Sequence, residues 1–368
     1  MKQSKLRLLL LSVGSLAAQN VIDAIGTRRE RCVLIGTNSI ADVAGNFRCD
    51  TAYLVPPAAS GAAYIERIAE LIRQEQPDLV IPTRDDDVLA LAVLGEQSPH
   101  IDTVLLTGSV AAALVMNDKL ETARFAARHG LPFAPTAANT IEALDLAAIH
   151  GLPLIGKPRR GNGSRGVVLL RSTAEIERAF ESTTDLIAQP FLDPPSDIDA
   201  LIAPFESGLP FFFTFPESGR YAVQVIVGPG GAISKPFGAV STQVGGQAVF
   251  SRRCDDANLL DICRAYAVAA AVEGWKGPFS VQLKRTSEGA FVAFEMDGRF
   301  GGGTAARVFM GFDDVAEVIA RFLPEAAFPS IATTQSDMVQ KYLASYPIPR
   351  EGVAALRTLG RWSRAGRD

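Results

Sequence analysis

The stretch Gly277–Thr304, GPFSVQLKRTSEGAFVAFEMDGRFGGGT, is the most informative part of the chain. Two strand-like runs, Phe279–Arg285 and Ala290–Met296, flank a turn at Thr286–Gly289, and this pattern predicts a β-hairpin. The hairpin is followed by an arginine and a run of three glycines.

The side chains of this hairpin predict a metal site. With a symmetric turn, Gln282 pairs with Ala293, and Glu295 lies diagonally from Gln282 on the same face. Asp297 keeps that face by the period of two. Such oxygen ligands suit Mg²⁺, which usually shares its shell with nucleotide phosphates, and Arg299 adds a fixed positive charge. An ordinary surface hairpin with scattered polar residues is the alternative interpretation.

Length and composition describe an ordinary globular protein. The chain has 368 residues, of which 48% are hydrophobic and 21% charged, and this length predicts two or three domains. A net charge of −4 favours neither nucleic acid nor an acidic membrane as a partner. The four cysteines lack CxxC or Cys/His spacing, which predicts reduced thiols and a cytoplasmic protein. No segment is long enough to span a membrane.

Residues 1–112 alternate strand and helix patterns, beginning with the apolar run Leu8–Val13. This leucine-rich N-terminus also has features of a signal peptide, but it continues directly into an amphipathic stretch, which favours a buried strand and its helix. The alternation predicts a parallel, doubly wound sheet, which binds ligands at the carboxyl ends of its strands. Ser12–Ser15 and the acidic cluster Arg84–Asp87 fall on that edge. The aspartates either hold a substrate amine or cap the next helix, and capping is favoured.

A cationic, glycine-rich loop is the second candidate site. Strand-like segments Leu152–Lys157 and Gly166–Leu170 flank the loop Pro158–Arg165, PRRGNGSR. Such a loop can fold over phosphates with its backbone N–H groups and positive charge, although glycine-rich hairpin loops are common. Lys157 ends the first strand. Lys119 stands at a helix start, where a cation opposes the helix dipole, and this placement hints at anion binding.

The order of these segments resembles the ATP-grasp superfamily, specifically its carbamoyl-phosphate-synthase-like branch of carboxylate–amine ligases. NDKLETARFAARHGLPFAPT resembles the segment that opens the small ATP-binding lobe, and LPLIGKPRRGNGSRGV resembles its strand, lysine and mobile loop. IAQPFL is similar to the adenine-binding hinge, and VQL with AFEMDGRFGGG is similar to the metal motif. The resemblance covers roughly residues 1–325.

This resemblance implies an α/β and α+β fold, in which an N-terminal doubly wound parallel-sheet (pre-ATP-grasp) domain precedes a two-lobed ATP-grasp domain. Residues 1–112 would form the Rossmann-like pre-ATP-grasp domain and residues 113–188 the small lobe with its glycine loop. Residues 189–340 would form the large lobe with the metal site, and residues 341–368 a C-terminal tail.

The resemblance also implies an ATP-dependent, ADP-forming ligase. It would join a small-molecule carboxylate, amino-acid-like or peptide-like, to an amine through an acyl phosphate, with ATP and Mg²⁺ or Mn²⁺. Arg299 and Lys157 would be catalytic, and Gln282, Glu295 and Asp297 would hold the metal. The residues that would contact the nucleotide are Lys119, Lys157, Arg160, Gly161, Gly163, Ser164, Gln189, Phe191 and Leu192.

The partners implied are small-molecule substrates, without nucleic acid or membrane. A homodimer is left open, because the apolar segment PFFFTF at 210–215 is a candidate contact between two copies.

Several positions depart from the family pattern. Asp297 and Gly298 replace the usual asparagine and proline. Pro190 stands where a hinge glutamate is common, and Arg220 and Gln224 occupy the places of an acidic residue that often contacts the ribose. These departures support a second hypothesis, a nucleotide-binding protein that kept the fold without ligase activity. A third, a Rossmann-type oxidoreductase, rests on the N-terminal domain alone and lacks the GxGxxG fingerprint.

Overall fold

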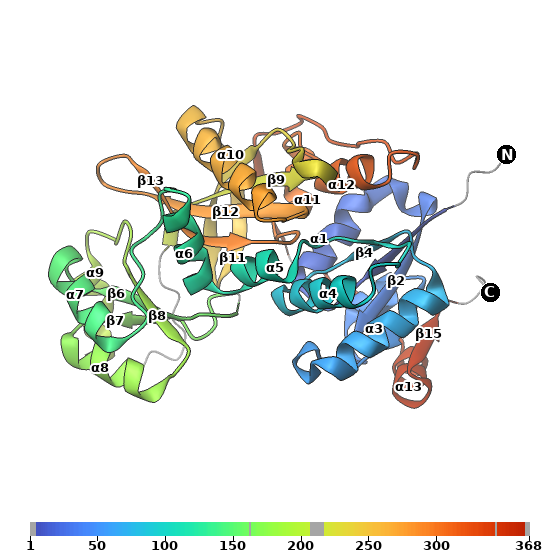
Figure 1. The fold of residues 1–368 in the computed structure, drawn as a ribbon, viewed down its shortest axis with the longest axis horizontal. Coiled ribbons are helices and arrows are strands. Elements are labelled where there is room, and N and C mark those ends of the chain that lie inside the picture. Colours follow the sequence, from blue (N-terminus) through green and yellow to red (C-terminus); the bar gives the residue numbers. More distant parts are fainter. Residues whose placement is uncertain (1–4, 162, 207–216, 343, 365–368) are drawn as a thin grey trace.

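The computed structural model describes residues 5–161, 163–206, 217–342 and 344–364. Three β-sheets organise this part of the chain (Figure 1). Sheet A and sheet B have six strands each, and sheet C has three.

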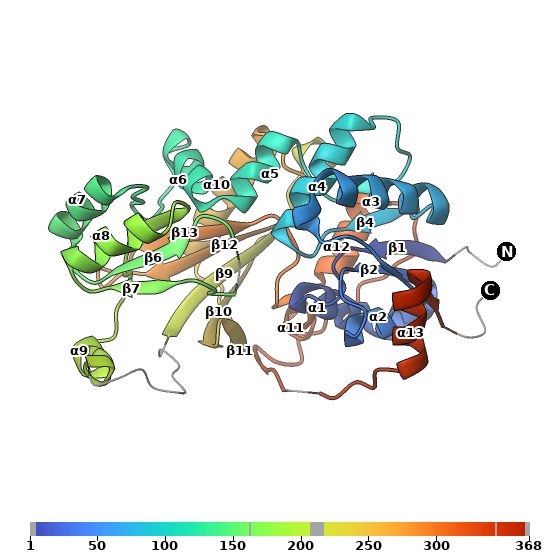
Figure 2. The same ribbon diagram turned by 90° about the horizontal axis from the view of Figure 1, so that it is seen from below.

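Sheet A belongs to the N-terminal region and has the strand order β15–β3–β2–β1–β4–β5. Its strands are β1 (Leu6–Leu10), β2 (Cys32–Asn38), β3 (Thr51–Leu54), β4 (Leu79–Ile81), β5 (Val104–Leu105) and β15 (Arg361–Ser363). All neighbours pair in parallel except β15 with β3. The helices around it are α1 (Leu16–Ile25), α2 (Ala44–Arg48), α3 (Ala62–Glu75) and α4 (Asp85–Gln97). Helices α1 and α2 cover one face and α3 and α4 the other (Figure 2), so the predicted doubly wound parallel sheet is confirmed.

The leucine run at the N-terminus is a strand in the middle of sheet A, between β2 and β4. Leu8 and Leu10 pack on the α1 side and Leu9 on the α3 side, which explains why the run is continuously apolar. The predicted strand Leu8–Val13 was placed too late, because the chain leaves the sheet at a left-handed turn at Ser12.

Sheet B is antiparallel, with the order β13–β12–β9–β10–β11–β14. Its strands are β9 (Glu217–Val227), β10 (Phe237–Val244), β11 (Gln247–Arg253), β12 (Gly277–Arg285), β13 (Phe291–Asp297) and β14 (Met338–Gln340). The helices beside it are α10 (Ala257–Val272), α11 (Thr304–Phe309) and α12 (Asp314–Phe322), and α5 (Val110–Asn117) and α6 (Lys119–Arg128) precede the small lobe. Between β9 and β10 only Ile233 bridges back to Val227, and the strand that pairs with β9 starts at Phe237.

Sheet C is the centre of the small lobe, with the order β7–β6–β8. Its strands are β6 (Leu154–Pro158), β7 (Val168–Leu170) and β8 (Leu186–Pro190), and α7 (Thr140–His150) and α8 (Thr173–Ser182) pack on them around a separate small core. One segment joins this lobe to sheet B: Ala134 N donates to Ala293 O at 2.7 Å, and Ala137 bridges Ala188 of β8.

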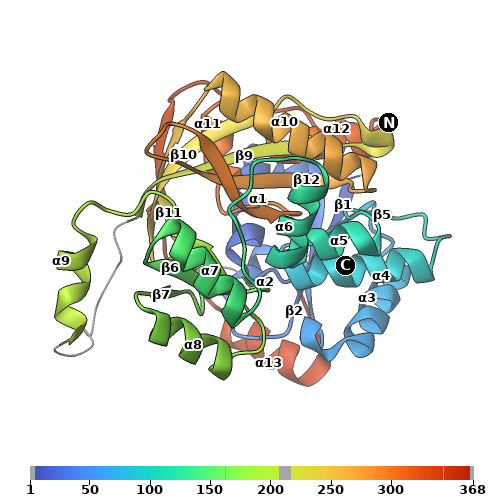
Figure 3. The same cartoon turned by 60° about the vertical axis from the view of Figure 1, so that its left-hand side comes forward.

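A short helix, α9 (Ile198–Ile202), follows β8 and stands apart from the three sheets (Figure 3). The PFFFTF segment proposed as a contact between two copies lies outside the described residues.

Sheets A and B share one hydrophobic core, which includes Leu8 of β1 and Ile226 of β9, with Ile22 of α1 and Val315 and Ile319 of α12. A buried ion pair reinforces this junction: Arg28 Nη1 lies 2.7 Å from Asp313 Oδ2. The N-terminal domain and the large lobe are therefore packed as a continuous body.

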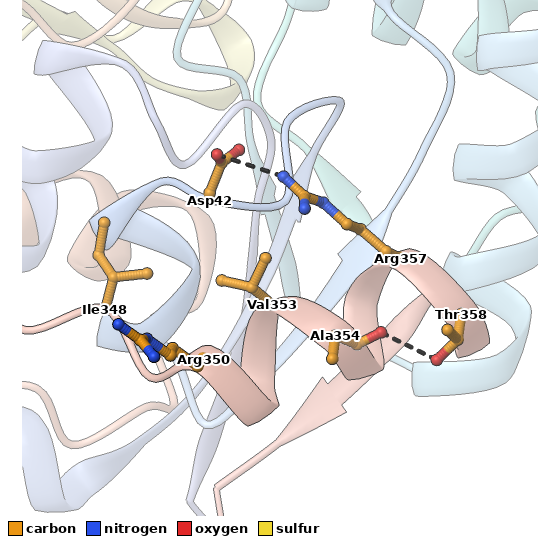
Figure 4. Close-up of a pocket in the computed structure, with 7 residues that line it drawn as sticks. All are labelled: Asp42, Ile348, Arg350, Val353, Ala354, Arg357 and Thr358. Atoms are coloured by element: carbon orange, nitrogen blue, oxygen red, sulfur yellow. Dashed lines mark hydrogen bonds and ion pairs between the residues drawn. The ribbon is translucent and has the colours of Figure 1, made fainter.

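Within the C-terminal tail, β15 adds antiparallel to β3 at the edge of sheet A. Helix α13 (Arg350–Leu359) leads into β15, and a surface hollow of about 500 Å³ lies along it (Figure 4). Arg357 in this hollow lies 3.3 Å from Asp42. Helix α13, along which the hollow lies, is next to sheet A and away from sheet C in Figure 1.

All four cysteines are free thiols. Among the described residues, no helix combines the length and apolar character needed to cross a bilayer.

Asp87 caps the start of α4 and organises the edge of sheet A. Its carboxylate accepts hydrogen bonds from the hydroxyls of Ser12 (2.9 Å) and Tyr64 (2.7 Å) and from the backbone N–H groups of Thr83 and Arg84. The favoured capping interpretation therefore holds for this aspartate.

Replacing Asp87 with Ala should lower the free energy of unfolding by about 2–4 kcal/mol, because it leaves buried donors without an acceptor. Asp86→Ala is the matched control, since Asp86 is the exposed neighbour, and it should change stability by less than about 0.5 kcal/mol. Denaturant unfolding of both variants measures the difference. Equal stabilities would contradict the structural role of Asp87.

Candidate functional site

The predicted hairpin exists, but its register differs from the symmetric one. Gln282 lies directly opposite Glu295 rather than Ala293. Two shifts cause this difference: Arg285 pairs with Phe291, and Phe294 is an extra residue on β13, where the pairing jumps from Leu283–Ala293 to Gln282–Glu295. Such a β-bulge bends the strand and redirects its side chains. The two shifts together keep Gln282 and Glu295 on one face.

The three predicted metal ligands lie together. Gln282 Nε2 donates to Asp297 Oδ2 at 2.6 Å, and Glu295 is the cross-strand neighbour of Gln282. Two carboxylates and an amide oxygen form a donor set of the hard kind that Mg²⁺ prefers. Among the described residues, no group of three or more His, Cys, Asp or Glu is assembled for a metal. A cation bound here would therefore need ligands from another molecule to complete its shell.

The two carboxylates differ in their electrostatic surroundings. Burial alone would raise the pKa of Glu295, but Lys119, Lys157 and Arg220 together hold it below its usual value. Burial raises the pKa of Asp297, and the neighbouring Glu295 carboxylate adds to this effect, while Arg299 opposes it. Glu295 thus faces three cations, whereas Asp297 lies beside one cation, Arg299, and two other carboxylates, Glu295 and Asp85.

The bulge at Phe294 positions two of these cations. Lys157 is the next-to-last residue of β6, and its Nζ donates to the carbonyl of Phe294 at 3.0 Å. Lys157 Nζ and the Arg220 guanidinium each lie 5.1 Å from the centre of the Phe294 ring. Arg220 Nη2 also approaches Glu295 to 4.0 Å. Sequence analysis noticed Arg220 only as a departure from the family pattern.

Lys119 connects α6 with the glycine loop and with the hairpin. Its Nζ donates to Gly161 O at 2.9 Å and lies 3.3 Å from Glu295 Oε1. The preceding residue, Asp118, caps α6 and accepts two hydrogen bonds from Arg159, at 2.6 and 3.0 Å. Arg159 is thus committed to structure. Arg160, 3.7 Å from Asp118, is more than half exposed.

The glycine loop lies against sheet B. Gly161, Gly163 and Ser164 have positive φ. A Cβ on Gly246, in the β10–β11 turn, would lie only 2.6 Å from Gly163 O, whereas a Cβ on the neighbouring Gly245 would point into open space. The loop of the small lobe therefore contacts the opposite lobe at a glycine.

The predicted hinge residues lie at the end of β8. Gln189 is buried, and its Nε2 donates to Thr136 Oγ1 at 2.9 Å, within the segment that joins the lobes. Phe191 and Leu192 follow Pro190 and are half-buried.

Two departures from the family pattern have packing causes. Gly298 has no room for a Cβ, which would lie 2.5 Å from Cη2 of Trp275. Gln224 is buried and accepts a hydrogen bond from Arg307 at 3.1 Å, and Arg307 also binds Asp314. Gln224 is therefore part of an internal polar network.

Arg299 joins the hairpin to sheet A. Its Nε donates to Asp85 Oδ1 at 2.7 Å, and its Nη2 donates to Asp85 Oδ2 at 3.3 Å and to Asp297 Oδ1 at 3.1 Å. Burial would lower the pKa of Arg299, but the two carboxylates raise it, so the guanidinium stays charged. Asp85 was predicted to lie on the ligand-binding edge of the sheet, but no sequence pattern indicated that it pairs with Arg299.

Comparison with known proteins follows from this geometry. No family model matches the chain. The formate-dependent phosphoribosylglycinamide formyltransferase of Synechococcus sp. (strain RCC307) is 28% identical over 48% of this chain, and that of Dechloromonas aromatica is 26% identical over 76%. The N5-carboxyaminoimidazole ribonucleotide synthase of Synechococcus elongatus is 34% identical over 29% of the chain. The matched segments span 43%, 66% and 28% of these relatives, respectively.

Solved structures share the fold at lower identity. The N5-carboxyaminoimidazole synthetase of Staphylococcus aureus, complexed with ADP, covers 92% of this chain and 81% of its own, with a TM-score of 0.64 and 11% identity. The biotin carboxylase of Campylobacter jejuni covers 90% of this chain and 73% of its own, with a TM-score of 0.63 and 18% identity. The chain has the fold of these solved structures, and the curated relatives match it over part of their length.

Proposed function

We propose that this protein is an ATP-dependent, ADP-forming ligase that activates a small-molecule carboxylate as an acyl phosphate and joins it to an amine. The observation that carries the proposal is the convergence, around the Phe294 bulge, of oxygen donors from the hairpin with cations from three other segments, α6, β6 and β9. Lys119, Lys157 and Arg220 surround Glu295, beside Gln282 and Asp297. Phosphoryl transfer depends mainly on positioning and charge neutralisation, which such a set supplies.

Gln282, Glu295 and Asp297 would hold Mg²⁺, or Mn²⁺. When bound, the metal would neutralise developing charge on the phosphates. The donor set fits this role because its three oxygens leave positions for phosphate oxygens, as Mg²⁺ sites with nucleotides require.

Lys119 and Lys157 would hold the phosphates of ATP, and Arg220 adds a third positive charge beside them. Glu295 now balances part of this charge. The glycine loop, including Arg160, Gly161, Gly163 and Ser164, would cover the phosphates from the small lobe. Gln189, Phe191 and Leu192 would border the adenine at the hinge.

The reaction has two steps. A carboxylate oxygen of the substrate attacks the γ-phosphorus, the bond to the β-phosphate oxygen breaks, and ADP leaves. The amine then attacks the carbonyl carbon, the bond to the phosphate oxygen breaks, and the nitrogen loses a proton as inorganic phosphate departs. Arg299 would hold the carboxylate or the transferred phosphoryl group through its planar fork. No nucleophilic side chain is needed.

Named relatives and neighbours support this proposal in part. The curated relatives include a formyltransferase that uses formate and a synthase of a carboxyamino compound, and a 2-oxoglutarate carboxylase domain was solved as a dimer with MgADP and bicarbonate. A homodimer of this chain remains a prediction. The rival hypothesis, a nucleotide-binding protein without ligase activity, is disfavoured because donors, cations and Arg299 occur together.

Replacing Glu295 with Gln should reduce kcat on the order of 100-fold and raise the Mg²⁺ concentration needed by at least about 10-fold, because a metal-binding charge is lost without a change in shape. ADP release, measured against Mg²⁺ concentration, tests both effects. Glu288→Gln is the matched control, since Glu288 is exposed in the turn of the same hairpin. Near-normal turnover of the Glu295 variant would contradict the metal assignment.

Replacing Gly246 with Ala should slow turnover by about 10-fold or more, because the new Cβ would collide with the carbonyl of Gly163 and keep the glycine loop away from the phosphates. Gly245→Ala is a close control: both glycines have positive φ, but a Cβ at position 245 meets no atom. Steady-state kinetics of ADP formation compares the two. Equal losses in both variants would attribute the effect to backbone strain instead of loop contact.

A further inference from the structure

The pair formed by Arg299 and Asp85 is a buried ion pair at the junction of two domains. Each side chain is only 12% exposed, and Asp85 accepts hydrogen bonds from both Nε and Nη2 of the guanidinium. We propose that Asp85 is a specificity-determining residue, which binds a cationic group next to the carboxylate that Arg299 receives. This inference rests on the proposed ligase function and narrows its substrate to a carboxylate that carries a nearby ammonium.

Asp85 occupies hydrogen-bond donors of Arg299 that a substrate carboxylate could use. The edge formed by Nε and Nη2 is one of the two edges of a guanidinium that can bind a carboxylate with two parallel hydrogen bonds, and Asp85 now occupies it. A substrate carboxylate can take this edge only if Arg299 releases both hydrogen bonds to Asp85.

The low exposure of Arg299 and Asp85 makes the charge of an inserted ligand important. Removing one partner from a buried ion pair is costly, because the other charge is left without compensation. A simple monocarboxylate would compensate Arg299 but would break both hydrogen bonds that Asp85 accepts from it. A substrate that carries an ammonium as well as a carboxylate replaces one ion pair with two. The pair therefore favours a zwitterion.

The short distance between Arg299 and Asp85 limits the separation of the two charges on a ligand. Arg299 and Asp85 are in direct contact, at 2.7 Å, so the two charges of an inserted ligand must also lie close together. An ammonium on the carbon next to the carboxylate, or one carbon further, meets this condition. A long ω-amino acid does not, since its charges are separated by several methylene groups.

Asp85 also has a suitable position at the start of α4. Of the three consecutive aspartates, Asp87 caps the helix from within and Asp86 is exposed, so Asp85 alone is directed to the hairpin. It begins α4 at the carboxyl edge of β4, where doubly wound sheets bind ligands. The hydrogen bonds of Asp87 to Ser12 and Tyr64 fix this turn. Asp85 is therefore held in place before any ligand arrives.

The test uses hydroxylamine, which captures an acyl phosphate whatever the natural amine is. Its nitrogen forms a bond to the carbonyl carbon and loses a proton while inorganic phosphate leaves, and the hydroxamate is measured by its colour with iron. The full-length protein receives MgATP, hydroxylamine and a panel of free α- and β-amino acids. Their N-acetyl derivatives and the corresponding unsubstituted monocarboxylates complete the panel.

We expect the protein to use its best free amino acid at least about 10-fold more efficiently than the N-acetyl derivative, measured as kcat/KM, since one charge-assisted contact is lost. Asp85→Asn should reduce this ratio about 10-fold, towards one. In the Asp85→Glu variant the ratio should stay well above the ratio in the Asp85→Asn variant. In the control variant Asp86→Asn the ratio should equal that of the unmodified protein. Thermal unfolding of each variant checks that the fold is retained.

The outcomes separate the two proposals. Equal use of free and N-acetylated acids, or an unchanged ratio in Asp85→Asn, would overturn the role of Asp85 and leave the ligase function standing. Absence of hydroxamate from every carboxylate, while calorimetry still detects binding of MgATP, would overturn the ligase function itself. If the Asp85→Asn variant is unfolded, the Asp85→Glu variant tests the proposal instead. A ratio of kcat/KM values near one in Asp85→Glu would contradict the proposal.

Discussion

The β-bulge at Phe294 is the constraint on which the candidate site depends. One extra residue in β13 brings Glu295 directly opposite Gln282, and it turns the carbonyl and the ring of Phe294 toward the small lobe. A one-residue slip in a strand moves every later side chain to the other face. Without the bulge, Glu295 and Asp297 would point away from Lys157. A local backbone irregularity thus determines whether donors and cations meet.

Contacts of different kinds link the three sheets around that bulge. Sheets A and B share a hydrophobic core and the buried pair of Arg28 with Asp313, which makes them a common platform. Sheet C has its own small core. It contacts sheet B through the connecting segment Ala134–Ala137, through Lys157 and through the glycine loop. Because the core of the small lobe is separate from that of the other two sheets, this lobe can move with less loss of packing than they can. Under the proposed function, such movement would let it cover the nucleotide phosphates.

Sequence patterns predicted the elements whose periodicity is strong and local, such as the doubly wound sheet, the hairpin and the strand that ends at Lys157. They could not predict the bulge, because neither Phe294 nor its neighbours differ in character from an ordinary strand. The pair of Asp85 with Arg299 was missed for another reason: it joins residues 214 positions apart, and only the tertiary structure brings them together. The strand β15 was missed because its three residues, Arg361–Ser363, are polar and aromatic and carry no alternation. Gly298 shows the same limit, since the ring that excludes a side chain there belongs to Trp275.

Departures from the family pattern are easier to understand as a redistribution of charge. Asp297 adds a negative charge on the side of the site that already holds Asp85 and Arg299, while Arg220 adds a positive charge on the side of Lys119 and Lys157. Under the proposed function, the site is consequently divided into a half that would attract a divalent cation and a half that would attract phosphates. Glu295 stands between them, opposite Gln282 and in contact with Lys119. A metal–nucleotide complex has its own charges arranged in this order, with the cation bound beside a chain of phosphates. The division therefore favours the complex over either component alone, because each component would leave one half of the site uncompensated.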